Sequence, residues 1–577
     1  MKNKGAIIYF LFFVIFLHFP AHSQTPCVAG NAAGFPCQNV DLMAHLPLDS
    51  LGGASSANDV WGWTDTLTGK EYAIIGLGNG TAFVDISDPV NPVYLGTLPT
   101  ATSNSSWRDI KVYGDFAFVV SEAGSHGVQS FDLRTLRNVA SPPTTFSALD
   151  RLTAIGNAHN IVGLEEAGYM VVVGAGTCSG GLTFVNVQDP ANMVLDGCFS
   201  SDGYTHDAVC FVYQGSDTEH VGKQICIASN TDTQTFVDVT NKSNPVSLAR
   251  IPYASDYTHQ GWITPDHKYL IFGDELDETR KSVPTRTFIM DISDLDNPSD
   301  PVYFEATTAA IDHNQYVRGR FAYQANYRAG FRMMDLKNIS TITLNEAAYF
   351  DIYPDNDNGN FNGAWSVFPY FQSGLVVVSG IEQGLFILKP TVPQIVMDAN
   401  RLPVLAGCSD QNIVFDINLT SFGGFSESVT LSVTGVPPEA SAIFATNPIV
   451  PDASTTLTLH NANGFNGVHS LTIQARGPMN DTLQDLSVAF KISDNLYIDD
   501  SFLSMYGQSG VYHAANLVEI DAELAVDNHI DLNAGEEIHL HPNFVVPQGS
   551  SFHAWIENCG VAAKVPTTFV SEAQRVR

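Results

Sequence analysis

Short apolar stretches that alternate with polar residues recur along the chain from about residue 53 to residue 390. The clearest form has Phe, Val or Ile at every second position and then a turn of Asp, Asn and Pro, as in residues 83–92, 236–245 and 290–298. Such alternation is typical of half-buried β-strands, and these turn residues end strands. About four strands fall in each stretch of about 50 residues, without a helical period between them. The pattern predicts an all-β chain in which each stretch is one blade of a β-propeller.

A polar signature precedes the first strand of each unit, and four of these signatures carry a histidine, at spacings of 47, 53 and 54 residues. Aligning the strands that follow extends the series to seven equivalent positions. These are Asn58, Arg108, His159, His206, His259, His313 and Trp365. In a repeat of this length, one equivalent position of each unit falls in one ring. The sequence therefore predicts a seven-bladed propeller with these residues at the start of the innermost strands.

The two ends of this propeller region also carry a pattern. The seventh unit stops at residues 384–388 without an outer strand, and residues 41–47 resemble the outer strand of the first unit, residues 93–99. An N-terminal strand that completes the last blade would remove an open sheet edge. We therefore assign residues 24–390 to the propeller.

The sequence pattern changes after Pro390. Residues 391–492 alternate apolar and polar positions between turn signals every eight to twelve residues or so, which indicates an immunoglobulin-like β-sandwich. Residues 493–561 contain shorter strands and predict a small β-stack, and residues 562–577 form a tail.

Composition and charge indicate where the protein is located and which partners it could bind. Residues 1–23 combine Lys2 and Lys4 with an apolar run and a small-residue site, the pattern of a secretory signal. No other run of about 18 apolar residues exists, so we expect a mature chain without a transmembrane helix, secreted or held at the cell surface. The net charge of −33 argues against nucleic acid as a partner. It is compatible with extracellular solubility and also with divalent cation binding.

The eight cysteines all follow the expected cleavage site, and an even number in an exported chain favours disulfides. Neighbourhood in the sequence suggests three short-range pairs and leaves one possible long-range pair, although the connectivity is open. The suggested pairs are Cys27 with Cys37, Cys178 with Cys198, Cys210 with Cys226, and Cys408 with Cys559.

The blade pattern resembles the LVIVD repeat. The histidine signatures, together with residues 178–185, 274–280 and 362–367, resemble the choice-of-anchor B family over about residues 36–390. That resemblance implies exported bacterial proteins that share this domain and differ in the C-terminal device that attaches them to the surface. The following module resembles the Ig-like modules of secreted bacterial proteins, and the last one resembles the three-coathanger stack domain of exported Bacteroidetes proteins.

The ring of histidines has two interpretations. His159, His206, His259 and His313 form a ligand set that suits Fe, Cu or Zn, with the neighbouring Asn160, Asp207, Gln260 and Asn314 placed to hold the second ring nitrogens. Alternatively, each imidazole links to the next blade and stiffens the ring. Arg108 in the same ring opposes a cation unless it pairs with Asp109 or Asp59. The acidic loops 274–278 and 351–360 have oxygen ligands at calcium-like alternation but lack a full EF-hand pattern, so they are calcium sites or solvated loops.

Polar and aromatic residues beside the ring are candidates for binding a ligand at the channel mouth. They are Asn58, Asp59, Trp61, Trp107, Arg108, Asp109, Asp207, Trp262 and Trp365. No catalytic motif such as a nucleophile elbow or a P-loop is present, and we assign no catalytic residue. Two hypotheses follow: an exported, surface-attached propeller that binds an extracellular protein or polysaccharide without catalysis, and an enzyme with a metal held by the four histidines on the propeller axis.

Overall fold

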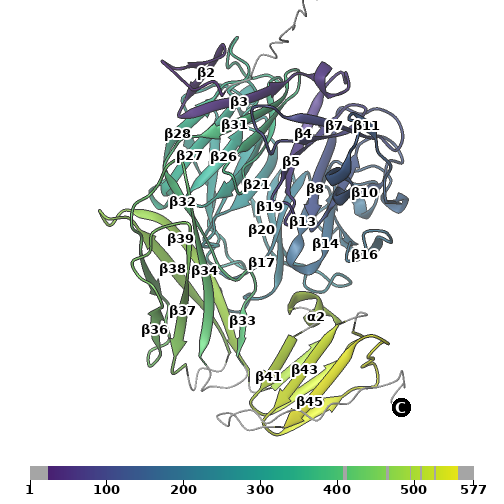
Figure 1. The fold of residues 1–577 in the computed structure, drawn as a ribbon, viewed down its shortest axis with the longest axis vertical. Coiled ribbons are helices and arrows are strands. Elements are labelled where there is room, and N and C mark those ends of the chain that lie inside the picture. Colours follow the sequence, from purple (N-terminus) through teal and green to yellow (C-terminus); the bar gives the residue numbers. More distant parts are fainter. Residues whose placement is uncertain are drawn as a thin grey trace, which may run out of the picture.

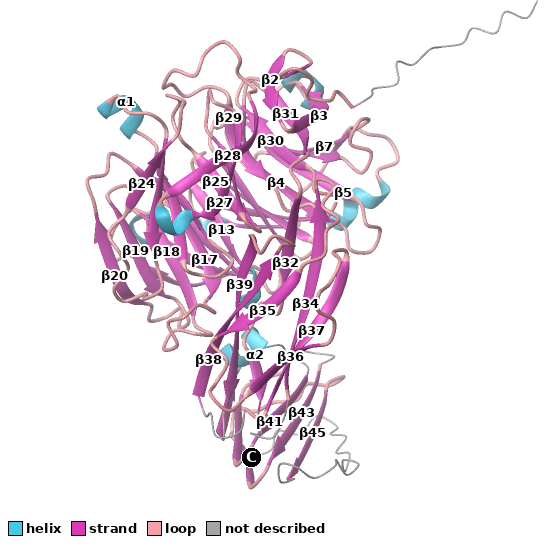
Figure 2. Cartoon of the chain, turned by 90° about the vertical axis from the view of Figure 1, so that its left-hand side faces the viewer, coloured by secondary structure: helices cyan, strands magenta, loops and turns pink. Residues whose placement is uncertain are grey.

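The computed structural model describes residues 24–406, 412–462, 467–493, 495–506, 510–524 and 528–556. Within these ranges the fold is all-β, with two short α-helices, α1 (Asp277–Lys281) and α2 (Asp500–Tyr506) (Figures 1 and 2). The expected signal and tail, as well as Cys408 and Cys559, lie outside the described residues. In the part of the chain that the structure describes, no helix is long and apolar enough to cross a membrane.

Residues up to Pro390 form seven sheets that follow one another along the chain. The first sheet consists of β4 (Ala57–Thr64), β5 (Glu71–Leu77), β6 (Gly80–Asp85) and β7 (Val93–Pro99), edged by β11 (Thr144–Thr145); the second of β8 (Arg108–Tyr113), β9 (Phe116–Ser121), β10 (Val128–Asp132) and β12 (Asp150–Leu152); and the third of β13 (Asn160–Leu164), β14 (Tyr169–Val173), β15 (Leu182–Asn186) and β16 (Val194–Phe199). The fourth sheet consists of β17 (Asp207–Val212), β18 (Gln224–Ser229), β19 (Thr233–Asp238) and β20 (Val246–Pro252), and the fifth of β21 (Thr258–Ile263), β22 (Tyr269–Asp274), β23 (Arg286–Asp291) and β24 (Val302–Glu305). The sixth sheet consists of β25 (Asn314–Arg318), β26 (Phe321–Ala325), β27 (Phe331–Asn338) and β28 (Thr343–Phe350), edged by β2 (Phe35–Gln38) and β1 (Asn31–Ala32), and the seventh of β29 (Ala364–Phe368), β30 (Val376–Gly380), β31 (Gly384–Pro390) and β3 (Val40–Leu46).

The first strands of these sheets surround a common axis. Each contacts the first strand of the next sheet, in the order β4, β8, β13, β17, β21, β25 and β29, and β29 contacts β4 again. This radial arrangement of sheets is a β-propeller. The outermost strand of the last sheet, β3, comes from the N-terminal part of the chain and pairs antiparallel with β31.

The burial of the strands explains their composition. Every residue of β5 and of β30 is buried, because neighbouring sheets cover both faces of these strands. Their sequences are therefore mostly apolar, with Glu71 at the start of β5 and Ser379 near the end of β30. In β16, at an outer edge, most side chains are exposed. The alternation is clearer in the second domain, where β34 buries every second side chain along most of its length.

Residues after Pro390 form two further pairs of sheets. The first pair consists of β32 (Gln394–Asp398), β34 (Ile413–Phe422), β37 (Ala453–His460) and β36 (Ser441–Phe444), facing β33 (Val404–Ala406), β39 (Thr482–Ile492), β38 (Gly467–Arg476) and β35 (Thr430–Thr434). Both sheets supply one core, so the unit is a β-sandwich. In the second pair, the strands within each sheet are parallel. One sheet consists of β40 (Asn495–Asp499), β42 (Leu517–Asp521) and β44 (Glu537–Leu540), and the other of β41 (Gly510–Ala514), β43 (His529–Ala534) and β45 (Ser551–Ile556).

The sandwich lies against the end of the propeller at which the inner strands finish (Figure 1). Gln214, just after β17, donates to the carbonyl oxygens of Asn400 and Arg401 and accepts a hydrogen bond from the amide of Ala489. The Ser487 hydroxyl donates to the carbonyl oxygen of Asp266, just after β21. The end at which the inner strands begin, where the histidines lie, is therefore the opposite one.

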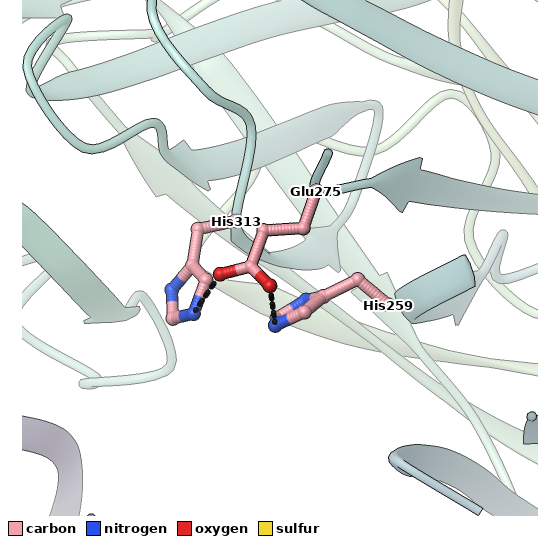
Figure 3. A group of neighbouring side chains, drawn as sticks. All are labelled: His259, Glu275 and His313. Carbon is pink, nitrogen blue, oxygen red and sulfur yellow. Dashed lines mark ion pairs between the residues drawn. The ribbon is translucent and has the colours of Figure 1, made fainter. Parts of the chain in front are cut away.

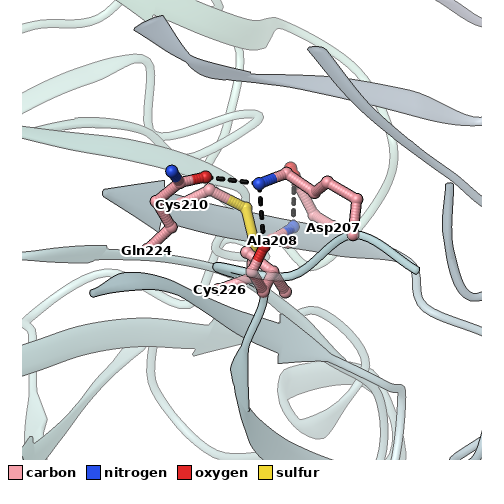
Figure 4. The surroundings of a disulfide bond; sticks show 7 residues. Asp207, Ala208, Cys210, Gln224 and Cys226 are labelled. Carbon is pink, nitrogen blue, oxygen red and sulfur yellow. Dashed lines mark hydrogen bonds between the residues drawn. A yellow bond between two sulfur atoms is a disulfide. The ribbon is translucent and has the colours of Figure 1, made fainter. Parts of the chain in front are cut away.

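Three of the expected cysteine pairs are disulfide bonds in the structure: Cys27–Cys37, Cys178–Cys198 and Cys210–Cys226. The third joins directly opposed residues of β17 and β18 (Figure 4). It therefore ties the strand that follows His206 to its neighbour within the same sheet.

Candidate metal centre

The four histidines form a row around one side of the propeller axis. Neighbouring ring centroids are 4.3 Å apart from His159 to His206, 4.3 Å from His206 to His259 and 4.4 Å from His259 to His313. Each residue lies at or just before the start of the inner strand of its sheet. The repeat thus brings equivalent positions of four successive sheets into contact.

Two of these imidazoles have their Nδ1 atoms fixed by the backbone of the next sheet. The Nδ1 of His206 lies 3.2 Å from the carbonyl oxygen of His259, and that of His313 lies 2.5 Å from the carbonyl oxygen of Trp365. A carbonyl only accepts, so each Nδ1 carries the proton, and a neutral ring then has its lone pair on Nε2. These links stiffen the ring, and they also leave a metal-binding nitrogen on each imidazole.

Glu275 joins the row of histidines. One carboxylate oxygen lies 3.7 Å from the Nε2 of His313, and the other lies 3.9 Å from the Nε2 of His259 (Figure 3). One ligand atom of each of the three residues lies within 4.8 Å of the others. The Tyr327 hydroxyl donates a 2.8 Å hydrogen bond to the carboxylate and so orients it. Two histidines and one carboxylate form a ligand set used for zinc and for non-haem iron.

The electrostatics of the centre favour neutral imidazoles. Burial lowers the pKa of His313 to about 4 and holds the pKa values of His206 and His259 well below the ordinary value. Burial also raises the pKa of Glu275 to about 7. Neutral rings could bind a metal without first losing a proton, and a bound cation would compensate the buried carboxylate.

The structure groups the predicted ligands differently from the expected four-histidine set. His313 and His259 meet with Glu275, whereas the Nδ1 of His159 lies 2.6 Å from the Oε1 of Glu122. The expected partners of the second ring nitrogens also differ. Asn160 donates to the carbonyl oxygen of His206, and Gln260 exchanges two hydrogen bonds with the backbone of Gln315. These amides link adjacent inner strands. The Nδ1 atoms of His206 and His313 meet backbone carbonyl groups, that of His159 meets Glu122, and that of His259 is buried without a hydrogen bond.

Several residues expected at the channel mouth are buried along the axis. Asn58, Asp59, Trp61, Arg108 and Asp109 are all less than a tenth exposed, and Asp207, Trp262 and Trp365 are partly buried. The ammonium group of Lys111 lies 2.6 Å from Asp109 and 3.3 Å from Asp59, and 4.6 Å from the ring centroid of Trp61. Although burial disfavours its charge, the two carboxylates raise the pKa of Lys111. Asn58, Asp59, Trp61, Arg108 and Asp109 are therefore part of the interior.

Arg108 does not pair with Asp59 or Asp109, because Lys111 occupies that role. Its guanidinium donates to the carbonyl oxygen of Leu77 and to the Nε2 of His126. Burial lowers the pKa of Arg108 to about 10. The arginine thus points toward the neighbouring sheet and not toward the metal ligands.

Exposed aromatic side chains lie beside the histidine end of the axis. Trp107, Tyr204 and Phe361 are 44%, 40% and 47% exposed, and each precedes the inner strand of its sheet. Phe361 packs against Tyr327, whose ring lies 4.5 Å from that of His313. Of the tryptophans expected at this mouth, Trp107 is the exposed one.

Glu275, Glu122 and Tyr327 were not predicted as partners of the histidines, yet the topology contains a signal for them. In an antiparallel sheet, the end of the second strand lies opposite the start of the first. Thr258 pairs with Asp274, Arg108 with Ser121, and Asn314 with Ala325. Residues just after the second strand of a unit therefore reach the same end of the axis as the histidines.

The acidic loops also differ from each other. In the described residues, groups of metal-ligating side chains include Asp277, Glu278 and Asp312, but none from residues 351–360. Asp355 and Asp357 are exposed. The first loop is thus divided between two clusters, one with Glu275 and one with Asp277 and Glu278, and the second is a solvated loop.

The model of the LVIVD repeat matches residues 67–100 and 106–125. The chain is a propeller repeat protein. No curated protein matches its sequence. Among solved structures, the chain is similar to a protein from Lactobacillus plantarum, with 12% sequence identity, coverage of 56% of this chain and 88% of that chain, and a TM-score of 0.38. It is also similar to the periplasmic gluconolactonase of Pseudomonas aeruginosa, with 11% identity, coverage of 58% of this chain and 100% of that chain, and a TM-score of 0.38. An ancestral GH74 enzyme has 11% identity, with coverage of 77% of this chain and 62% of that chain and a TM-score of 0.36.

Proposed function

We propose that this protein is an exported, surface-attached, seven-bladed propeller of the choice-of-anchor B type that binds a divalent transition metal on its axis through His259, Glu275 and His313. The following units would serve as an Ig-like spacer and a coathanger-like stack near the anchor. The observation that carries the metal proposal is the approach of two imidazole Nε2 atoms to one carboxylate, at 3.7 and 3.9 Å.

Catalysis of a metal-assisted reaction is the activity that this ligand set supports best. Structural zinc sites have four protein ligands, whereas catalytic sites have three and keep a position open for water or substrate. A metal held here would lower the pKa of its bound water or polarise a substrate oxygen. Trp107, Tyr204 and Phe361 at the rim are suited to stacking on a sugar ring or on a side chain of a protein.

Binding without catalysis is the second candidate, and the exposed aromatic rim is the observation that favours it. In that case the histidine row is a structural feature, as the Nδ1 bonds of His206 and His313 to backbone carbonyl groups suggest. An extracellular polysaccharide or protein would be the partner in both cases.

Metal analysis separates these candidates. We expect purified protein to contain about one equivalent of Zn, Fe or Cu, and His259→Ala and His313→Ala to lose it. His460→Ala is the matched control, because His460 lies in the sandwich and bonds to Asn412. Metal-free protein that takes up no metal on addition of Zn²⁺, Fe²⁺ or Cu²⁺ would reject the metal site and leave the binding function.

A further inference from the structure

A second acidic cluster adjoins the metal centre. Asp277 and Glu278 begin helix α1, two and three residues after Glu275, and Asp312 directly precedes His313. One carboxylate oxygen of each lies within 4.8 Å of the others. Asp277, Glu278 and Asp312 are 0%, 5% and 4% exposed. The cluster therefore joins the sheet of β21–β24 to the sheet of β25–β28 in the interior of the protein.

Four of the six carboxylate oxygens of this cluster lack a hydrogen-bond donor. Asp277 Oδ1, Glu278 Oε2 and both carboxylate oxygens of Asp312 are buried without a hydrogen bond. Glu278 Oε1 accepts only long bonds, of 3.4 Å, from the amides of Arg286 and Asp312. Burying charged oxygens in this way is unfavourable unless a cation or a proton compensates them.

The cationic side chains nearby do not supply that compensation. Arg286 lies 3.3 Å from Asp277, but its guanidinium is shared with Glu305, at 2.7 Å. Among the described residues, Glu278 and Asp312 form no ion pair with a lysine, an arginine or a histidine. The buried pair of Asp59 and Asp109, by contrast, has the ammonium group of Lys111 between its carboxylates.

The backbone leaves room for Asp312. A Cβ atom at Gly273, next to the last residue of β22, would lie 1.7 Å from Asp312 Oδ2. Glycine at this position thus lets a carboxylate approach the strand closely, although the strand offers it no hydrogen bond.

We propose that Asp277, Glu278 and Asp312 bind a calcium ion, which fastens the segment carrying Glu275 to the strand that follows His313. Three carboxylates supply three to six oxygens, and backbone carbonyl groups or water complete the six to eight that calcium prefers. The absence of nitrogen or sulfur ligands distinguishes this cluster from the histidine centre. The proposal does not require a metal at His259 and is tested separately.

The test is calcium binding by full-length protein that has first been stripped of metal. We expect about 10 mM CaCl₂ to saturate the site and to raise the melting temperature by several degrees, because an ion that binds only the folded state stabilises it. Isothermal titration should show binding with one ion per chain. Asp312→Asn should abolish both effects, and Asp355→Asn, which removes one exposed carboxylate from a solvated loop, should keep them.

The outcomes distinguish this site from the histidine centre. His259→Ala should keep the full response to calcium, since its imidazole belongs to the other cluster. If Asp312→Asn does not fold, Glu278→Gln tests the same site, because its amide keeps the acceptor Oε1. Folded wild-type protein that shows neither heat nor a shift with calcium would overturn the proposal. A higher melting temperature of Asp312→Asn without calcium, in the same experiment, would assign the cluster to a shared proton.

Discussion

The two ends of the propeller axis differ in what the inner strands meet there. Where these strands begin, His259 and His313 face Glu275 across 3.7–3.9 Å, and exposed aromatic side chains precede three of the strands. Where β17 and β21 finish, the sandwich covers them and binds Gln214 and the carbonyl of Asp266. The same seven strands thus form an open end, which the sandwich leaves uncovered and where buried imidazoles face a carboxylate, and a covered end that positions a second domain. The candidate metal ligands therefore lie at the first end, and the sandwich is fixed at the second.

Lys111 lies between these two ends, and its removal should have the largest effect on the molecule. Lys111→Met leaves Asp59 and Asp109 buried without a cation, so we expect a loss of about 3–5 kcal/mol in the free energy of unfolding. Denaturant titration measures it. Lys70→Met is the matched control, because Lys70 pairs with Asp85 at 2.8 Å but is 47% exposed, and should cost at most about 1 kcal/mol. Equal losses in the two variants would show that the buried contacts of Lys111 with Asp59 and Asp109 stabilise the propeller no more than an exposed ion pair does.

The histidine row at the open end could be predicted from the sequence because the repeat sets which positions come together. A period of about 50 residues places equivalent positions in one ring, and the four histidines indeed form a row. Glu275 was predicted only as part of a possible calcium loop and not as a partner of the histidines, because it lies 16 residues after His259 and only the pairing of β21 with β22 brings it to the same end. Lys111 escaped prediction because nothing in an alternating strand marks a lysine as buried. The domain boundaries and the seven-blade division stay predictions, as do the two module types after Pro390.

At the covered end, His267 should make stability depend on pH. Its ring packs against Phe211 and Tyr213, and its Nδ1 accepts a hydrogen bond from the amide of Gln214. Burial lowers the pKa of His267 to about 4. Between pH 6.5 and 4 the unfolded chain binds more protons at this residue than the folded one, so its contribution to stability is lost as the pH falls.

We therefore expect His267→Asn to lose roughly 1–3 kcal/mol less stability than the wild type between pH 7 and pH 4. Asparagine tolerates the positive φ of 52° and offers an acceptor in place of Nδ1. Burial raises the pKa of the neighbouring Asp266, so its contribution to stability changes with pH in the opposite direction. That contribution is the same in the wild type and in His267→Asn. Unfolding curves at several pH values measure the difference, and parallel curves for the two proteins would contradict it. His460→Asn should follow the wild type.

At the open end, Tyr327 offers the smallest and most local change. Its hydroxyl donates to Glu275 at 2.8 Å, so Tyr327→Phe removes one hydrogen bond from a ligand without removing the ligand. Loss of such a support typically weakens metal binding about 10-fold or more, while stability should fall by about 1 kcal/mol. Competition with a coloured chelator measures the affinity. Tyr497→Phe is the control, since Tyr497 also donates to a carboxylate, that of Asp521, but in the last unit of the chain. An unchanged affinity in Tyr327→Phe would mean that Glu275 does not hold the metal in the orientation seen here, and would move the centre toward His159 and His206.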